Sequence, residues 1–336
     1  MSWRSALNTR LNDWMMDENR NHRGQGEVMR KARESGVQLV VVGSIGIDTI
    51  ETKSTRRENV LGGSVSYACL AASLFSRVGM VGVVGDDFPE EFITLYENSG
   101  IDMAGLQRKK GRTFRWAGAY EEDMDHRRTL STELNVFESF SPELPSSYQD
   151  APYFLLGNIS PDLQLHVLSQ ARRPVFAVAD TMDLWIKTAR ETLMQVISKV
   201  QLLTINDGEA RQLTGEMNIK TAARRILGWG PQFVVIKKGG HGAMLFSASE
   251  VAIVPAYPVD EVKDPTGAGD SFAGAFMGVI ARAREVSMNS IRRALLYGSV
   301  VASFGVQDFS VENIKALNLE AVEARRSELK GMVAVE

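Results

Sequence analysis

Residues 262–278 read VKDPTGAGDSFAGAFMG and lead from a turn into a helix. Pro265 fixes its own φ angle and disfavours a helix just upstream of itself. From Ser271 onward, small and large apolar residues alternate in a pattern typical of a helix. The segment Gly267-Ala268-Gly269 leaves the backbone nearly bare, so the first N–H groups of this helix lack partners. With the helix dipole, these amides predict an anion hole that suits phosphate.

Asp270 follows this bare segment directly. A carboxylate is a poor ligand for phosphate because like charges repel, but it can take a proton from a group that attacks phosphorus. We therefore predict that Asp270 is a general base. The alternative is that Gly267 and Gly269 form a tight turn and Asp270 only caps the helix. The length of the motif and other parts of the chain favour the base.

Buried β-branched runs alternate with helical patterns along most of the chain, which predicts a parallel sheet between two layers of helices, an α/β fold. The predicted strands are Leu39–Ile47, Arg77–Gly85, Tyr153–Leu156, Val175–Ala179, Gln201–Ile205 and Phe233–Ile236, followed by a hairpin over Ala243–Phe246 and Val251–Val254.

Three departures from this alternation suggest the domain organisation. The polar segment 1–37 is predicted to be a flexible N-terminal extension, with a short amphipathic piece near its start. The main domain is predicted over 38–320, and 321–336 is interpreted as a C-terminal tail. Strand-like segments near 49–61 and 112–136 predict a small sheet that stands off the main body as a lid.

Composition excludes several classes of function. The 336 residues include 38 basic and 41 acidic residues, a net charge of −3 that does not indicate binding to nucleic acid or to a membrane surface. No apolar run is long enough to span a membrane, and the N-terminus lacks the apolar stretch of a secretory signal. The one cysteine, Cys69, excludes a disulfide framework, and we expect a cytoplasmic protein.

Two further groups of residues suggest binding roles. Asp48 follows a predicted strand, where ligands of open α/β sheets bind, although it could also simply start a turn. Gly62 and Gly63 precede a helix and would let the backbone approach a ligand closely. Asn206 and Glu209 lie three residues apart at a strand–helix junction, where they could hold hydrated Mg²⁺ or form a capping pair.

The segment Lys237–Gly242, KKGGHG, combines basic residues with glycines. Such a loop can approach phosphates, or it can be a charged hairpin turn. The sequence alone leaves both interpretations open.

Together these motifs resemble the ribokinase family, also called the PfkB carbohydrate kinase family, over nearly the whole chain. DPTGAGD at 264–270 resembles the C-terminal signature of that family and is the most specific of the motifs. LGGS at 61–64, NDGE at 206–209 and IKKGGHG at 236–242 resemble its other motifs, in the same order. The resemblance implies a three-layer α/β/α fold with a β-sheet lid, and an ATP-dependent kinase that acts on a sugar or nucleoside.

The resemblance also implies roles for individual residues. Asp270 would be the catalytic base, and the amides of Gly267, Ala268 and Gly269 would form the anion hole. The acceptor would be held by four residues, Asp48, Gly62, Gly63 and Asn158. The nucleotide and its Mg²⁺, bound through water near Glu209, would be held by Asn206, Glu209, Lys238, Gly239 and Gly242. A K⁺ ion near Asp264 is also implied.

Some positions depart from the ribokinase pattern and leave the acceptor open. Gly46, Tyr67 and Asn158 stand where ribokinases proper carry Asn, Asn and an acidic residue. Tyr67 could stack on a base or fill the core, so a small sugar and a ribonucleoside both remain candidates. A non-catalytic nucleotide or sugar sensor on the same fold is the alternative from another class. A nicotinamide dehydrogenase is rejected because GxGxxG is missing.

The lid strands also bear on assembly. A small sheet of this kind has exposed edges, and two such edges can pair with one another. We therefore expect a homodimer formed through the lid strands.

Overall fold

The computed structural model of this protein describes residues 36–124 and 127–333. The chain divides at Gly36, and residues 37–336 form one compact unit. The predicted N-terminal extension 1–37, with its amphipathic piece, therefore lies outside the described residues except for its last two.

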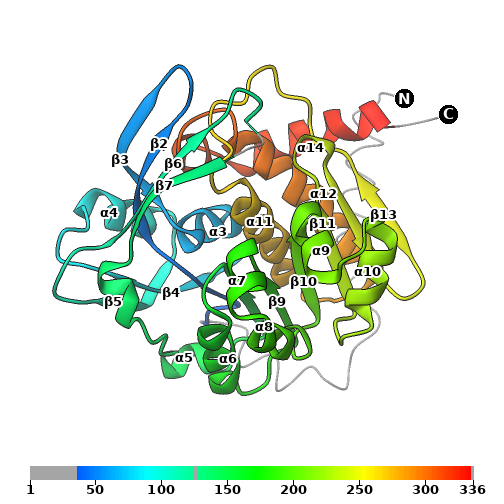
Figure 1. Cartoon of the computed structure of the whole chain (residues 1–336), viewed down its shortest axis with the longest axis horizontal. Helices are drawn as coiled ribbons and strands as arrows, with labels where there is room; N and C mark the ends of the chain where they lie inside the picture. Colours follow the sequence, from blue (N-terminus) through cyan, green and yellow to red (C-terminus); the bar gives the residue numbers. More distant parts are fainter. Residues whose placement is uncertain (1–35, 125–126, 334–336) are drawn as a thin grey trace, which may run out of the picture. The chain divides into compact units, whose positions relative to one another are not determined.

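A nine-stranded sheet forms the centre of this unit (Figure 1). Along the sheet the order is β13-β12-β11-β10-β9-β8-β1-β4-β5. Neighbouring strands are parallel except for the pairs that involve β12 and β13. In chain order the strands are β1 (Leu39–Val42), β4 (Val78–Val84), β5 (Asp102–Arg108), β8 (Tyr153–Leu156), β9 (Phe176–Asp180), β10 (Leu202–Asn206), β11 (Phe233–Lys237), β12 (Ala243–Phe246) and β13 (Val251–Val254).

Helices cover both faces of this sheet. One core contains Leu39 and Val41 of β1, and it is covered by α3 (Ser64–Ser73), α4 (Glu90–Asn98), α11 (Ala268–Ala283), α12 (Met288–Gly305), α13 (Glu312–Lys315) and α14 (Leu319–Val333). The other core contains Val40 and Val42, and it is covered by α5 (Ser146–Gln149), α6 (Pro161–Gln170), α7 (Asp183–Thr188), α8 (Arg190–Ile197), α9 (Asp207–Thr214) and α10 (Ile219–Leu227). Because alternate strand residues face opposite sides, a strand buried on both faces reads as a continuous apolar run. The predicted three-layer α/β/α fold is confirmed.

A second sheet, the lid sheet, is built from the segments that the sequence set apart. Its strands are β2 (Gly46–Glu51), β3 (Arg56–Gly62), β6 (Phe114–Tyr120) and β7 (Arg127–Glu133), in the order β3-β2-β6-β7. Figure 1 shows these strands standing away from the central sheet. β2 pairs parallel with β6, whereas the two outer pairs are antiparallel. Two short 3-10 helices, η2 (Asn135–Ser139) and η3 (Gly239–His241), complete the described elements.

The first predicted strand, Leu39–Ile47, is wrong in its extent. The central strand β1 ends at Val42, and Gly46 already belongs to the lid sheet. The chain changes sheets at Gly43, where a Cβ atom would lie 2.3 Å from the Ser64 hydroxyl oxygen. Asp48 therefore sits within a lid strand instead of just beyond a central one. The continuous apolar run hid this break.

The C-terminal segment 321–336, interpreted from sequence as a tail, contains most of α14. Val322 and Leu329 of this helix are buried in the same core as α11 and α12. In the described residues, the segment up to Val333 is thus part of the packed body.

Close packing of α11 on α3 fixes the position of the glycine-rich motif. A Cβ atom on Gly274 would lie 2.2 Å from the carbonyl oxygen of Ala68, and one on Gly278 would lie 2.8 Å from that of Ala72. These glycines therefore let the two helix backbones approach. The N-terminus of α11 is held in place by this contact.

Candidate active site

The N-terminus of α11 is the centre of the candidate site. Gly267 precedes the helix in the left-handed region, with φ of 73°. Its Cβ position lies 2.4 Å from the ring of Tyr67, so the Tyr67 ring packs against the loop instead of leaving a base-binding face here. The amide of Ala268 donates to the carbonyl of Pro265 at 3.2 Å. Of the predicted anion-hole amides, Ala268 therefore already has a partner, and those of Gly267 and Gly269 are the better donors to a ligand.

Asp264 holds the loop that leads into this helix. Its side chain is buried, and its two carboxylate oxygens accept from the amides of Thr266 at 2.8 Å and Ser310 at 2.9 Å. Burial raises the pKa of Asp264, although these hydrogen bonds oppose the shift. Thr266 in turn donates its hydroxyl to Tyr120 of the lid sheet at 2.9 Å. The loop, the lid and the chain after α12 thus meet at one point.

Asp270 lies in the first turn of α11, as predicted. Burial and the nearby carboxylate of Asp180 raise its pKa from 3.8 to about 7, while Lys237 and Arg127 act in the opposite direction. A carboxyl group that titrates near neutral pH can accept a proton and release it again. The electrostatics therefore suit the predicted base.

Asp48 and the two glycines form one cluster, as the sequence analysis expected. The Cβ position of Gly62 lies 2.0 Å from the nearer Asp48 carboxylate oxygen, so only glycine leaves room for this side chain. Gly63 has φ of 90°. Asp48 is 4% exposed, and its Oδ1 atom has no hydrogen-bond partner among the described residues.

The charge on Asp48 is unfavourable in this environment. Burial raises its pKa from 3.8 to about 8, and the carboxylates of Asp264 and Asp270 add to the shift, whereas Arg127 opposes it. Asp48 therefore lies within electrostatic range of both Asp264 and Asp270. A buried oxygen without a partner needs a donor, which a ligand hydroxyl would supply.

Asn158 lies on a neighbouring strand end, but its amide group is already engaged. Its oxygen accepts from the indole N–H of Trp185 at 2.9 Å, and its nitrogen lies 3.1 Å from the sulfur of Met182. The amide oxygen that a ligand would need is thus shared with Trp185. A direct role for Asn158 with an acceptor stays a prediction.

Asn206 and Glu209 form a capping box on α9. The Asn206 side chain accepts from the Glu209 amide at 2.7 Å, and the Glu209 side chain accepts from the Asn206 amide at 2.9 Å. Burial raises the pKa of Glu209 from 4.5 to about 7, which Lys237 opposes and Asp180 assists. The capping role is therefore present, and Glu209 also lies within electrostatic range of Lys237 and Asp180.

The predicted nucleotide-side loop is a hairpin turn between β11 and β12. The amide of Lys238 donates to the carbonyl of Gly242 at 2.8 Å, and Gly239 lies in the short helix η3 between them. Gly242 has φ of 84°, and a Cβ atom there would lie 2.1 Å from the carbonyl oxygen of Val254. The turn leaves Gly239 and Gly240 exposed, so their backbone is accessible to a ligand.

Two charged residues, Asp180 and Lys237, act on the pKa of Asp270. Sequence analysis did not single out Asp180, and it named Lys237 only as part of the basic loop 237–242. Lys237 Nζ lies 3.0 Å from the nearer carboxylate oxygen of Asp180, and both side chains are largely buried. Each is the last residue of a central strand, β11 or β9. The signal available in the sequence was their position, because charged residues at the carboxyl ends of parallel strands converge at one edge of the sheet.

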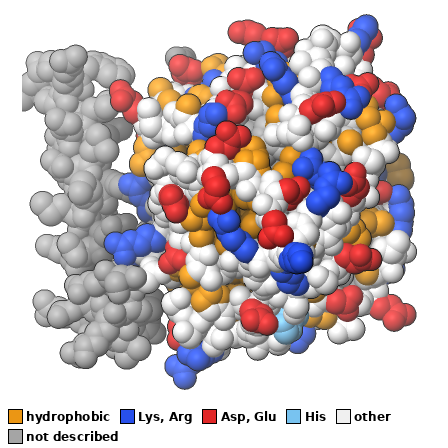
Figure 2. All heavy atoms as spheres, turned by 90° about the vertical axis from the view of Figure 1, so that its left-hand side faces the viewer, with side chains coloured by type: hydrophobic (Ala, Val, Ile, Leu, Met, Phe, Trp, Pro, Cys, Tyr) orange, Lys and Arg blue, Asp and Glu red, His pale blue; other side chains and the backbone are white. Residues whose placement is uncertain are grey.

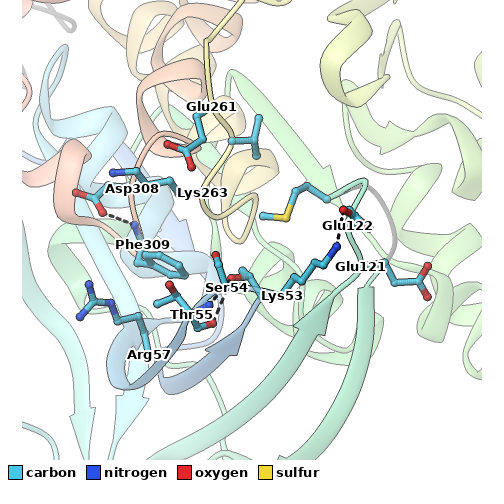
Figure 3. A pocket seen from close by; sticks show the side chains of 13 residues that line it. Lys53, Ser54, Thr55, Arg57, Glu121, Glu122, Glu261, Lys263, Asp308 and Phe309 are labelled. Carbon is cyan, nitrogen blue, oxygen red and sulfur yellow. Dashed lines mark hydrogen bonds and ion pairs between the residues drawn. The ribbon is translucent and has the colours of Figure 1, made fainter.

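A cleft of about 420 Å³ lies beside the candidate site, between the tips of the lid sheet and the body (Figure 3). Residues of both lid turns line it, and Lys53 in one turn pairs with Glu122 in the other at 2.6 Å. The body contributes Lys263 and Phe309. The lining does not include Asp48 or Asp270, so this cleft is distinct from the cluster around those two carboxylates.

The surface agrees with the near-neutral charge. Figure 2 shows acidic and basic side chains interspersed over one face. None of the described helices is long and apolar enough to cross a membrane. In residues 36–124 and 127–333, no three His, Cys, Asp or Glu side chains lie close enough together to hold a metal ion.

Comparison with known proteins identifies the family of this chain. The family model for pfkB family carbohydrate kinases matches residues 37–316. This chain belongs to the pfkB family of carbohydrate kinases. The match spans the central sheet, the lid sheet and the DPTGAGD motif, so the resemblance inferred from the motifs is confirmed.

Named members of the pfkB family include relatives of this chain with different acceptors. A cytidine kinase of Thermococcus kodakarensis is 32% identical over 257 residues, which cover 74% of this chain and 91% of that protein. A ribokinase of Bacillus subtilis is 26% identical, covering 82% and 94%. Among solved structures, the putative ribokinase II of E. coli with ATP and Mg²⁺ has a TM-score of 0.72 at 20% identity, covering 87% of this chain and 99% of that one. It shows the shared fold.

Proposed function

We propose that this protein transfers the γ-phosphoryl group of ATP to the primary hydroxyl of a ribonucleoside, with Asp270 as the general base. The observation that carries the proposal is Asp270 in the first turn of α11, after the Gly267–Gly269 segment, together with the buried, unpartnered carboxylate oxygen of Asp48. The cytidine kinase relative favours a nucleoside over a free sugar as acceptor. A small sugar is the second candidate, supported by the ribokinase relatives.

Asp48 supports the acceptor side of this proposal. Its unpartnered Oδ1 can accept a hydrogen bond from an acceptor hydroxyl, and Gly62 and Gly63 bring the backbone close to the same place. A buried carboxylate that accepts from hydroxyls discriminates strongly against compounds that lack them. This arrangement would orient the reacting hydroxyl toward Asp270.

The nucleotide side is supported by the strand ends of β10 and β11. The exposed glycines of the 239–242 turn would lie along the nucleotide, with the neighbouring Lys238 side chain beside its phosphates. Mg²⁺ would arrive with ATP, and Glu209, oriented by Asn206, would hold it through water molecules, since Mg²⁺ keeps several waters. No direct metal cage is needed for this role.

The proton of the acceptor hydroxyl has a defined destination. As the acceptor oxygen bonds to the γ-phosphorus, the bond from phosphorus to the β-phosphate oxygen breaks and ADP leaves. Asp270 takes the hydroxyl proton. The amides of Gly267 and Gly269 stabilise the negative charge on the transferring group, since preorganised donors act strongly in a buried site. The lid sheet would exclude water, which competes as an acceptor.

A K⁺ site near Asp264 is a further part of the proposal. Both Asp264 oxygens already accept from amides, so a cation here would depend on remaining lone pairs and on nearby carbonyls. The cation would act on the loop shape and not on the reacting atoms. The cytoplasm, which supplies ATP and keeps the buried thiol of Cys69 reduced, is the proposed location.

The direct test measures ADP release from Mg²⁺–ATP with ribonucleosides, deoxyribonucleosides, ribose and other small sugars, each with Na⁺ or K⁺. We expect turnover with at least one ribonucleoside and little with its 5′-deoxy analogue, which lacks the reacting hydroxyl. Turnover with free sugars alone would mean that the acceptor is a small sugar and not a ribonucleoside. Binding of ATP without turnover of any acceptor would instead support the alternative function, a non-catalytic nucleotide or sugar sensor.

The exposed edges of the lid sheet support a homodimer. β3 and β7 are its outer strands, and every residue of β7 is exposed. Unpaired strand edges can pair with a second copy. We expect size-exclusion chromatography with light scattering to give a mass twice that of the 37.0 kDa chain. A monomer at micromolar concentration would contradict this.

A further inference from the structure

Trp116 lies on the face of the lid sheet that looks toward the candidate site. β2 and β6 lie side by side (Figure 1), and Trp116 is the register partner of Asp48 in this parallel pair. The side chains of two such partners point to the same side of a sheet. Four residues further along β6, and therefore on the same face, Tyr120 contacts Thr266 in the loop before α11. Trp116 and Asp48 are thus neighbours on the face that meets the body.

Gly118 gives the indole of Trp116 its place. A Cβ atom on Gly118 would lie 2.0 Å from the nearest atom of the six-membered ring, so the ring occupies the space of the missing side chain. The indole N–H donates to the Thr129 hydroxyl at 3.3 Å, which anchors the ring at its other end. Trp116 is only partly buried. The lid therefore presents a flat aromatic side chain beside Asp48.

A cation lies over this ring. The guanidinium carbon of Arg127 is 5.4 Å from the centre of the Trp116 ring. Arg127 stands opposite Tyr120 in the pairing of β6 and β7. Its charge opposes the rise that burial causes in the pKa of Asp48 and Asp270. The planar group that covers the indole is therefore also within electrostatic range of both carboxylates.

Packing does not account for this position of Trp116. Within residues 36–124 and 127–333, Trp116 belongs to neither hydrophobic core. A guanidinium over an aromatic ring contributes little to stability where both are accessible to water. Tyr67, the aromatic residue that the sequence suggested for stacking, has its ring packed against Gly267. Trp116 is the aromatic residue beside Asp48 that keeps part of its surface accessible.

We propose that Trp116 stacks on the base of a ribonucleoside acceptor while Asp48, beside it, accepts hydrogen bonds from the ribose hydroxyls. This inference rests on the proposed function, because it assigns a place to the part of the acceptor that a free sugar lacks. The base takes the place of the Arg127 guanidinium over the indole, and no covalent bond changes. Because every base has a π face, Trp116 favours nucleosides over sugars without selecting one base.

The test is calorimetric titration of the full chain with cytidine, adenosine and ribose. The wild type should bind both nucleosides at least ~10-fold more tightly than ribose. For Trp116→Ala we expect Kd for both nucleosides to rise ~5- to 150-fold, the range for loss of base stacking, while Kd for ribose changes less than ~2-fold. Trp116→Phe should keep most of the affinity, because it retains an aromatic ring.

Arg128→Ala is the matched control. Arg128 is exposed and, as the neighbour of Arg127 in β7, points to the other face of the lid sheet. Its Kd values should equal those of the wild type.

Tryptophan fluorescence separates stacking from a structural role. Cytidine and adenosine should quench the fluorescence of the wild type, which has five tryptophans, more strongly than that of Trp116→Phe. A residue that only supports the lid would not produce this difference. The comparison also decides the question if Trp116→Ala does not fold, because Trp116→Phe keeps the ring.

Three results would overturn the inference. They are unchanged nucleoside Kd values in folded Trp116→Ala, an equal rise for nucleosides and ribose, and a wild type that binds ribose as tightly as the nucleosides or binds none of the three. If nucleosides bind through Trp116 but are not phosphorylated, the proposed kinase activity is wrong and this inference stands. If a sugar is phosphorylated and neither nucleoside binds, kinase activity stands and this inference falls.

Discussion

Replacing Asp270 with Ala or Asn is expected to lower kcat ~10²- to 10⁴-fold, the share usually carried by a general base. The carboxylate would be the group that receives the acceptor proton, and neither substitute can accept it. KM for ATP should change little, because Asp270 is proposed to act on the acceptor and not on the bound phosphates. The measurement is initial-rate kinetics on the acceptor identified by the substrate panel.

The pH profile gives an independent check on the same residue. With the pKa of Asp270 raised to about 7, the base is protonated at lower pH. The value of kcat/KM should therefore fall about tenfold per pH unit below pH 7 through protonation of Asp270, and this contribution should be absent from the residual activity of Asp270→Asn.

A fold control decides how a loss of activity is interpreted. Both Asp270 variants should unfold at a temperature no lower than the wild type, because the charge removed is partly buried and its pKa is raised to about 7 in the folded chain. Near-normal turnover in a folded variant would leave Asp270 as only a cap of α11. If Asp270→Ala loses both its activity and its folded state, the role of Asp270 is decided by the kinetics of Asp270→Asn, which keeps the size of the side chain.

The fold was predictable because its signals are local. Apolar runs such as Phe233–Ile236 mark strands that are buried on both faces, and the helices between them imply a parallel sheet. The break at Gly43 was not predictable, because residues 39–47 read as one β-branched run interrupted only by glycines and Ser44, while the change of sheet accompanies the approach of Ser64 to Gly43. β5 was also missed, since this edge strand is only partly buried.

The candidate site was predictable only where a motif carried it. Asp48, Gly62 and Asp270 were each singled out from sequence, and the structure brings them together. The pairing of Lys237 with Asp180 was not predictable, because they lie 57 residues apart and meet only when β9 and β11 flank β10. Such a pair carries no local pattern. The amide of Ala268 was assigned wholly to the anion hole, although it has a partner in Pro265.

Replacing Asp48 with Asn is expected to change catalysis and stability in opposite directions. Above about pH 8, where Asp48 carries its charge, charged hydrogen bonds to acceptor hydroxyls would be lost, so kcat/KM for the acceptor should fall ~10²- to 10³-fold, mainly through KM. Stability should rise instead, because Asp48 is buried with an unpartnered oxygen beside two other carboxylates. A residue that serves ligand binding at a cost in stability would show this combination of lower kcat/KM and higher stability when it is replaced.

The sign of the stability effect follows from the pKa of Asp48. This carboxyl group titrates near 3.8 in the unfolded chain and at about 8 in the folded one. Between these values the folded chain keeps a proton that the unfolded chain has lost, so the wild type loses stability as pH rises. Asn does not titrate. The Tm of Asp48→Asn should therefore exceed the wild-type value increasingly from pH 5 to pH 8, reaching a gain of about 3 to 6 °C.

Thermal unfolding at pH 5 and pH 8 provides the measurement, with Asp260→Asn as the matched control. Asp260 is exposed, and an exposed substitution changes the free energy of unfolding by less than about 0.5 kcal/mol. If Asp48→Asn lowered Tm at pH 8, Asp48 would be a structural residue with partners in the folded protein. If it raised Tm without weakening the acceptor, its unpartnered oxygen would serve no ligand, and the acceptor would have to be placed elsewhere around Asp270.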